Sequence, residues 1–160
     1  MHRSFLRLAA ALALTTLSAP ITCTAAPADP GHKAIEEVVE RFRTAIIDKD
    51  RPRFLSLFLP DSPVIWQAST EDASLARLRQ KRPQMMKVKV SAANNYVSFI
   101  DSIVADDKRN EETFANLRID SDGDIGSVSF DYVYLRDGVA SNHGRENWAL
   151  VRTEQGWKIV

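Results

Sequence analysis

Side chains that could carry acid–base chemistry are concentrated in one short region near the C-terminus. Asp131, Tyr132 and His143 are the candidate catalytic residues of this region. A tyrosine with a histidine in an apolar cup can polarise a carbonyl group, and an aspartate in apolar surroundings can have a raised pKa and act as a general base. Each residue also has a structural interpretation. Tyr132 and Tyr134 suit a core in which each hydroxyl reaches a partner, and His143 suits an exposed or hydrogen-bonded position.

The sequence predicts that a β-hairpin with a tight turn at Asp137-Gly138 positions these residues. Alternating aromatic and β-branched residues favour half-buried strands, and Asp-Gly supplies the positive φ angles of a two-residue turn. With that turn, Tyr132 lies opposite His143 and Tyr134 lies opposite Ser141. One face then carries Phe130, Tyr132, Tyr134 and His143, and the other carries Asp131, Val133, Leu135, Trp148 and Leu150.

Strand alternation limits which residues can share a pocket. Asp131 and Tyr132 are neighbours in the chain, so they cannot both face one pocket. A bulge at Gly144 would reverse which residues accompany His143. Trp66 and Trp148 suit a core and a pocket wall equally well. The candidate ligand-binding residues are Trp66, Phe130, Tyr132, Tyr134, Asn142, His143 and Trp148.

We expect no metal ion and no cofactor. Outside the leader described below, the sequence has only His32 and His143, too few for a histidine-rich metal site. The segment from Asp120 to Asp131 superficially resembles a calcium loop, but Ile125 stands where such a loop needs glycine, so a plain hairpin turn is favoured. The sequence also lacks G-x-G-x-x-G, P-loop, G-x-S-x-G and H-E-x-x-H motifs.

The N-terminus resembles a secretory signal peptide. Residues 1–26 combine a basic start, an apolar stretch from Leu8 to Leu17 and small residues before the expected cleavage near Ala26. We therefore expect residues 27–160 to be one periplasmic or secreted domain. Cys23 is the sole cysteine, and its alternative role as a lipoprotein cysteine is disfavoured because the preceding residues lack the usual Leu-small-small pattern.

The charge of the whole chain is balanced. It has 160 residues, with 21 basic and 21 acidic side chains. Such a chain gives no electrostatic reason to expect a nucleic acid or, after leader cleavage, a membrane as partner. A basic cluster at Arg77, Arg79, Lys81 and Arg82 favours either a solvated helix end or, less readily, an anion site.

Helices precede strands along the chain. Apolar residues at helical spacing predict an amphipathic helix from Ala34 to Asp48, and Asp50 is expected to cap a second, short helix. A strand is expected at residues 63–68, a short helix with Leu75 and Leu78, and another helix from residue 96 to 107. Four strands then follow in succession from Thr113. This order predicts an α+β domain whose curved antiparallel sheet wraps around the N-terminal helices.

These features carry a family resemblance. The opening helices and the closing Trp148-Ala149-Leu150 and Gly156-Trp157-Lys158-Ile159 segments resemble the NTF2-like (SnoaL/ketosteroid isomerase-like) superfamily. Residues 127–134, followed by Gly138 and Asn142-His143-Gly144, are similar to its lumazine-binding branch, although that branch often has histidine where Asn142 stands. The resemblance covers residues 34–160 and implies a cone-shaped domain that dimerises through the outer face of its sheet.

The resemblance leaves two classes of function, because this superfamily hosts isomerases, dehydratases and binding proteins on one scaffold. The favoured hypothesis is an exported, non-enzymatic domain whose aromatic cone binds a small apolar ligand, or which binds a protein partner through its sheet. The alternative is a cofactor-independent isomerase or dehydratase that uses Tyr132 or Tyr134 with His143 or Asp131.

Overall fold

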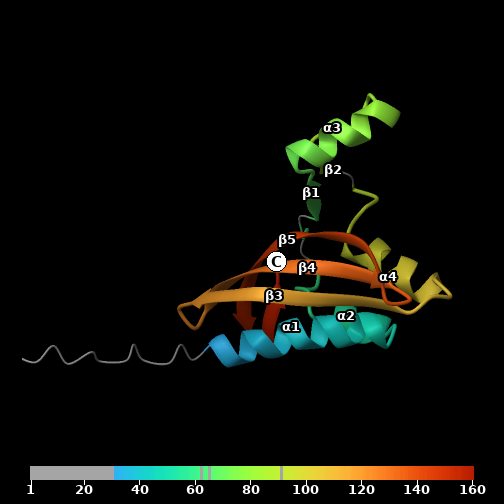
Figure 1. Ribbon diagram of the computed structural model, residues 1–160. Helices are drawn as coiled ribbons and strands as arrows, with labels where there is room; N and C mark the ends of the chain where they lie inside the picture. The colour runs from blue at the N-terminus through green and yellow to red at the C-terminus, as the bar shows by residue number, and fades with distance from the viewer. Residues whose placement is uncertain (1–30, 62, 65, 91) are drawn as a thin grey trace, which may run out of the picture.

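The computed structural model describes residues 31–61, 63–64, 66–90 and 92–160, so the expected signal peptide, residues 1–26, lies outside the described residues. Helices come first and a curved antiparallel sheet follows, which confirms the predicted α+β class (Figure 1). None of the described helices is long and apolar enough to cross a membrane. The elements are α1 (His32–Ile47), α2 (Arg51–Leu55), β1 (Gln67–Ser69), α3 (Asp72–Lys81), β2 (Val88–Val90), α4 (Tyr96–Ala105), β3 (Asn110–Ser121), β4 (Ile125–Arg136), β5 (Val139–Thr153) and β6 (Gly156–Ile159).

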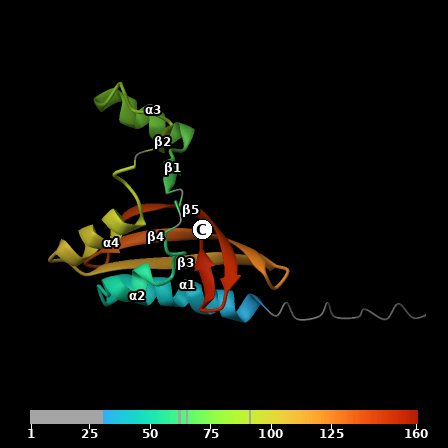
Figure 2. The ribbon, with the colours of Figure 1, turned by 180° about the vertical axis from the view of Figure 1, so that it is seen from behind.

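The helices form where the sequence supplies an apolar stripe and a cap. The stripe of α1 is buried, with Ile35, Phe42 and Ile46 at most 1% exposed. Asp50 caps α2 as predicted, because its side chain accepts a hydrogen bond of 3.0 Å from the backbone N–H of Arg53. Asn95 caps α4 in a reciprocal capping box. These helices pack against one face of the main sheet (Figure 2). We call this covered face the inner face and the opposite face the outer face.

The main sheet has the order β3-β4-β5-β6, with every neighbouring pair antiparallel. The turn between β4 and β5 is the predicted two-residue turn, since Asp137 and Gly138 have φ angles of 50° and 77°. The core fills the space between this sheet and α1, and aromatic rings dominate it. Phe42 lies 4.7 Å from Trp148 and 4.8 Å from Phe54, measured between ring centroids.

A β-bulge makes the register of the hairpin differ from the predicted one. Leu135 pairs with Ala140, but Tyr134 pairs with Asn142, so Ser141 is an extra residue on β5. The extra residue reverses the parity of β5, since one inserted residue moves each following side chain to the other face. The predicted pairing of Tyr132 with His143 is therefore wrong, because Tyr132 faces Gly144.

The second sheet is small and stands apart from the main one. β1 and β2 pair antiparallel and, with α3, form a projection from the body that we call the α3 arm, residues 67–90 (Figure 1). The predicted strand at residues 63–68 is displaced to Gln67–Ser69. The short helix is confirmed, with Leu75 buried.

Candidate functional site

The bulge divides the predicted site residues between the two faces of the sheet. Phe130, Tyr132, Tyr134, Asn142 and Trp148 share the inner face, which packs toward the helices. Trp148 was predicted for the opposite face, and the extra residue at Ser141 explains the error. Trp66 lies in a neighbouring aromatic group, 5.5 Å from Phe99 and 6.3 Å from Phe58 between ring centroids.

Asp131 and His143 lie on the outer face. His143 pairs with Val133, and its side chain is exposed, so the predicted grouping of His143 with Tyr132 and Tyr134 is wrong. The apolar surroundings expected for Asp131 are also wrong. Its carboxylate accepts hydrogen bonds from Arg145 Nε at 2.8 Å and from Asn116 Nδ2 at 2.7 Å, and these bonds lower its pKa.

Two glutamates that sequence reasoning missed occupy the inner face instead. Glu112 lies directly across from Tyr134 and is only 3% exposed. Burial, and then the nearby charge of Glu146, raise the pKa of Glu112 to about 9. In the described part of the chain, its Oε2 atom is buried and has no hydrogen-bond partner. Glu112 therefore favours the neutral, protonated form at pH 7.

Glu146 is the second member of this carboxyl pair. It lies across from Phe130, and one of its oxygens accepts a hydrogen bond of 2.8 Å from Trp148 Nε1. Burial raises its pKa, and the bond from Trp148 partly offsets that rise. A signal for both glutamates existed in the sequence. Glu112 is two residues from Phe114, and Glu146 is two residues from Trp148, so strand alternation places each glutamate on the same face of its strand as an aromatic residue.

Tyr132 has a hydroxyl group whose proton is free to donate. Its ring leans over Gly144, where an added Cβ would lie 2.9 Å from a ring carbon. Asn142 donates to the Tyr132 hydroxyl at 3.1 Å. The amide of Asn142 is oriented by the backbone N–H of His143, which donates to its Oδ1 at 2.9 Å, so the amino group must face the tyrosine. The Tyr132 oxygen is thus an acceptor toward Asn142, and its proton remains available for a ligand.

Tyr134 has the opposite hydrogen-bond polarity. Asn110, which is buried, donates its amino group to Asp106 Oδ2 at 3.2 Å and to the carbonyl of Lys108 at 3.0 Å. Its Oδ1 must therefore face Tyr134, which donates its proton at 2.7 Å. Burial raises the pKa of Tyr134 to about 12. Toward a ligand, Tyr134 is then an acceptor.

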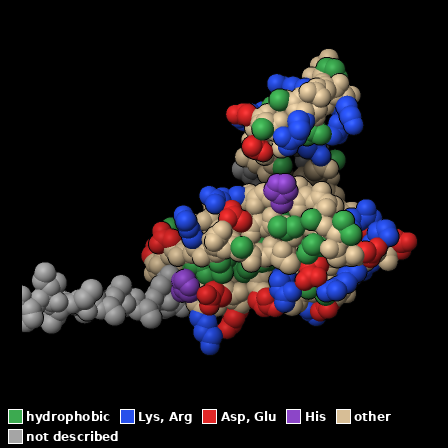
Figure 3. Space-filling model, in the orientation of Figure 1, with side chains coloured by type: hydrophobic (Ala, Val, Ile, Leu, Met, Phe, Trp, Pro, Cys, Tyr) green, Lys and Arg blue, Asp and Glu red, His purple; other side chains and the backbone are tan. Residues whose placement is uncertain are grey.

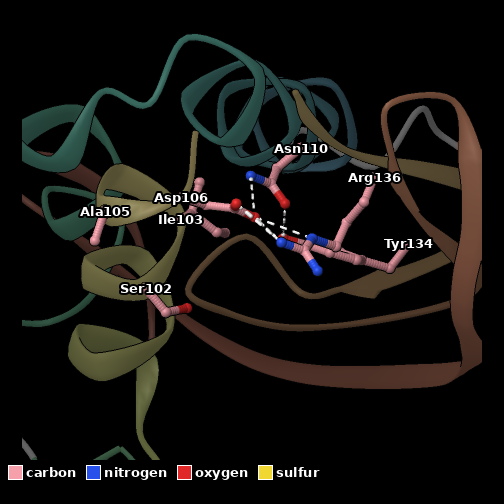
Figure 4. A pocket seen from close by; sticks show the side chains of 7 residues that line it. All are labelled: Ser102, Ile103, Ala105, Asp106, Asn110, Tyr134 and Arg136. Atoms are coloured by element: carbon pink, nitrogen blue, oxygen red, sulfur yellow. Dashed lines mark hydrogen bonds and ion pairs between the residues drawn. The ribbon is translucent and has the colours of Figure 1, made fainter. Parts of the chain in front are cut away.

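A hollow of about 570 Å³ lies at the end of the sheet beside these groups (Figure 4). The last turns of α4 form one wall, and Tyr134 and Asn110 form part of the other. At its rim Arg136 donates two hydrogen bonds to Asp106, at 3.0 and 2.9 Å, and this pairing lowers the pKa of Asp106. Tyr134, which lines this hollow, is also the residue that pairs with Glu112 across β3 and β4.

Metal ligands are not assembled in this region. No group of three or more His, Cys, Asp or Glu side chains suited to a metal ion occurs among the residues that the structure describes. The arrangement instead offers hydrogen-bond donors and acceptors of defined polarity on an aromatic surface.

The chain matches no protein-family model and no curated protein by sequence. Solved structures show its fold. An NTF2-like protein of unknown function from Pseudomonas putida KT2440 has 14% identical residues and a TM-score of 0.56, and the match covers 80% of each chain. A protein from Streptomyces avermitilis, provisionally named as a dehydratase of the NTF2-like family, has 16% identity and a TM-score of 0.54, covering 79% of this chain and 88% of that one.

A third similar structure, from Novosphingobium aromaticivorans, is provisionally named as a scytalone dehydratase. It has 13% identity and a TM-score of 0.53, and the match covers 80% of this chain and 78% of that chain. None of these matches singles out the lumazine-binding branch that the sequence resembles. At sequence identities this low, the structural similarity shows a common fold and does not show a common function. The curved sheet, the helices on its inner side and these three structures together show that the chain has the NTF2-like fold.

Proposed function

We propose that the inner face of the sheet binds a small, planar, largely apolar molecule that carries a hydroxyl or carbonyl oxygen. Glu112 carries this proposal, because its Oε2 atom is buried without a hydrogen-bond partner in the described part of the chain. Such an atom costs about 1–3 kcal/mol of stability. A polar group of a ligand that bonded to Glu112 would remove that cost.

The surroundings of Glu112 suit a flat molecule. Phe114 and Phe130 lie 4.4 Å apart between ring centroids, and Trp148 stands edge-on to Phe130 at 4.8 Å. Aromatic rings favour offset or edge-on contacts with another aromatic ring. The free proton of Tyr132 and the proton of neutral Glu112 can both be donated to a ligand oxygen. The hollow beside Tyr134 is large enough for a small ligand, whose sites usually measure 300–1,000 Å³.

Within this proposal the domain is exported and holds its ligand without turnover. The leader-like residues 1–26 support a periplasmic or secreted location. The predicted acid–base residues Asp131 and His143 lie on the outer face, away from the proposed ligand site on the inner face, which supports a binding role. Dimerisation through that outer face, as the family resemblance implies, remains part of the proposal.

Binding can be tested with 2-naphthol and naphthalene, which differ by one hydroxyl group. We expect 2-naphthol to quench tryptophan fluorescence and Glu112→Ala to weaken its binding about tenfold, the effect of one hydrogen bond. Naphthalene binding should be unchanged by Glu112→Ala, and His143→Ala is the matched outer-face control. Failure of 2-naphthol to bind, or equal weakening of both probes, would contradict the proposal.

The carboxyl pair also favours a second candidate, an isomerase or dehydratase without cofactor. Two titratable groups in one apolar site can divide the roles of acid and base. In a dehydration of a β-hydroxy ketone, Glu146 would accept the proton next to the carbonyl, and protonated Glu112 would give its proton to the departing hydroxyl group, which leaves as water. Tyr132 would donate a hydrogen bond to the carbonyl oxygen. Two of the similar structures are provisionally named as dehydratases.

Turnover separates the two candidates. An enzyme should dehydrate 4-hydroxy-2-butanone with a bell-shaped pH–rate profile, and Glu146→Gln should abolish turnover while leaving 2-naphthol binding in place. A binding protein should show no turnover above the solution rate at any pH.

A further inference from the structure

The cations of this chain are distributed unevenly. In the body, most arginines of α1, α2 and the main sheet pair with carboxylates, as Arg51 does with Asp101 at 2.6 Å and Arg145 with Asp131 at 2.8 Å. Arg41 and Lys158 bond instead to neutral oxygens of Ser56. The α3 arm, residues 67–90, contains six basic and only two acidic residues. One of its two acids, Asp72, pairs with Lys87. The arm is therefore a cationic segment of an otherwise balanced molecule.

The side chains of the arm leave much of this charge unpaired. Arg77 and Arg79 bond to neutral oxygens, of Ser74 and of the Met85 carbonyl. Lys81, Arg82 and Lys89 have no side-chain partner within the described part of the chain. Figure 3 shows blue side chains gathered over the arm. Charges of the body that lie farther than roughly 8 Å from the arm are largely screened at physiological ionic strength, so they contribute little to the field there.

Exposed apolar side chains lie among these cations. Met86 is 69% exposed and Val88 is 47% exposed, and they flank Lys87 in the chain. The arm projects from the body in both ribbon views, and no side-chain hydrogen bond or ion pair joins residues 67–90 to the rest of the described chain (Figures 1 and 2). A partner can therefore reach this surface without displacing any such bond.

We propose that the α3 arm binds the surface of an anionic lipid bilayer. Cations interleaved with a few apolar side chains suit this surface, because lipid phosphates attract the cations and the apolar groups enter the headgroup region. A stable protein interface needs a well-packed area of about 1,000 Å² or more, whereas a fluid bilayer needs no matching shape. Residues 67–90 contain no aromatic side chain that could stack on the bases of a single-stranded nucleic acid.

This inference goes beyond the proposed ligand site and does not depend on it. The whole-chain charge predicts no membrane partner, yet a local patch can attract lipid when the total charge is zero. Each basic residue near an anionic membrane strengthens binding roughly fivefold. Removal of three should then weaken partitioning by about 100-fold.

Vesicle co-sedimentation tests the proposal with the protein purified from the producing cell after leader cleavage. One set of vesicles is phosphatidylcholine alone, and the other contains equal parts of phosphatidylcholine and phosphatidylglycerol. We expect binding to the anionic set only, with loss at high salt. The variant R77Q/K81Q/R82Q should lose about 100-fold in partitioning. The body variant R109Q/R145Q/R152Q removes the same charge from exposed side chains and should bind as the parent does.

A second variant tests the apolar contribution. Met86→Gln should lower anionic-vesicle binding more than Leu117→Gln, which changes a body side chain that is 38% exposed. Equal losses in the arm and body triple variants would overturn the proposal, as would equal binding to both vesicle sets. Charge-dependent binding of the arm to polyglutamate or DNA, without binding to anionic vesicles, would also overturn it.

Discussion

The two faces of the main sheet hold carboxyl groups in opposite environments. On the outer face, Asp131 lies between Arg145 and Asn116, and these donors lower its pKa. On the inner face, Glu112 is buried beside another carboxyl, Glu146, and its pKa is raised. Strand parity alone decides between these outcomes, because adjacent residues in a strand point to opposite faces. An acidic residue of this sheet is therefore a candidate for the ligand site when its side chain points to the inner face. Its distance along the chain from other polar residues does not matter.

The two environments also have opposite consequences for stability. A carboxyl group whose pKa is raised by folding holds a proton that the unfolded chain releases, so the free energy of unfolding falls as pH rises between the unfolded and folded pKa values. A carboxyl group whose pKa is lowered contributes stability above its unfolded pKa and loses it as pH falls. Glu112 belongs to the first class and Asp131 to the second.

The largest expected difference between the faces concerns packing. Trp148→Ala should lower the free energy of unfolding by about 3–5 kcal/mol, because Trp148 is 7% exposed and contacts Phe42 and Phe130. Val133→Ala on the outer face, where the residue is 36% exposed, should cost less than about 1 kcal/mol. Urea denaturation of both variants measures the contrast. Similar losses would mean that the inner face is not the core.

A substitution of buried Glu112 should raise the free energy of unfolding, whereas most substitutions in a core lower it. Glu112→Gln should stabilise the protein at pH 7 by roughly 1–3 kcal/mol, because glutamine fills the same space and, unlike glutamate, does not have to take up a proton on folding. The parent should lose stability as pH rises from about 4.5 toward about 9, and the variant should lose much less. Thermal melts across this range provide the measurement.

Glu154→Gln is the matched control, because it makes the same chemical change at an exposed turn. It should leave the pH dependence of melting unchanged. A parent whose stability is flat between pH 5 and 9 would show that Glu112 is solvated or paired in the folded protein.

A smaller effect should separate the two tyrosines of the inner face. Tyr134→Phe leaves Oδ1 of buried Asn110 without its donor, and an unsatisfied buried acceptor costs about 1–3 kcal/mol. Tyr132→Phe removes only a bond from exposed Asn142, so its cost should stay below about 1 kcal/mol. Denaturation midpoints of the two single variants test this order, and a larger loss for Tyr132→Phe would contradict the assigned hydrogen-bond polarities.

The sequence predicts the fold well because its signals are local. The apolar stripe of α1, the Asp50 cap and the Asp137-Gly138 turn each act within a few residues, and the structure confirms all three. The strands follow from alternation in the same way. Element order then suffices to predict a curved sheet over helices.

The site is harder to predict because it depends on one inserted residue. The bulge at Ser141 has no strong local signal, yet it moves Trp148 to the inner face and His143 to the outer one. Glu112 and Glu146 were missed for a related reason. Their burial arises from contacts across β3, β4 and β5, and a charged residue in a strand is ordinarily assigned to the exposed face.

The exposed ion pair between Asp131 and Arg145 on the outer face should make the smallest contribution to stability. Asp131→Asn should lower the melting temperature slightly at pH 7 and low salt, because it weakens an exposed pairing with Arg145. High salt should remove the difference from the parent, since exposed ion pairs are screened. Acidification should remove it too, because the carboxylate of Asp131 becomes protonated once the pH falls below its lowered pKa. Melting curves at pH 7 and at a series of acidic pH values, each at two salt concentrations, test both trends. A large loss that persists in high salt would place Asp131 in a buried network and would erase the distinction between the two faces.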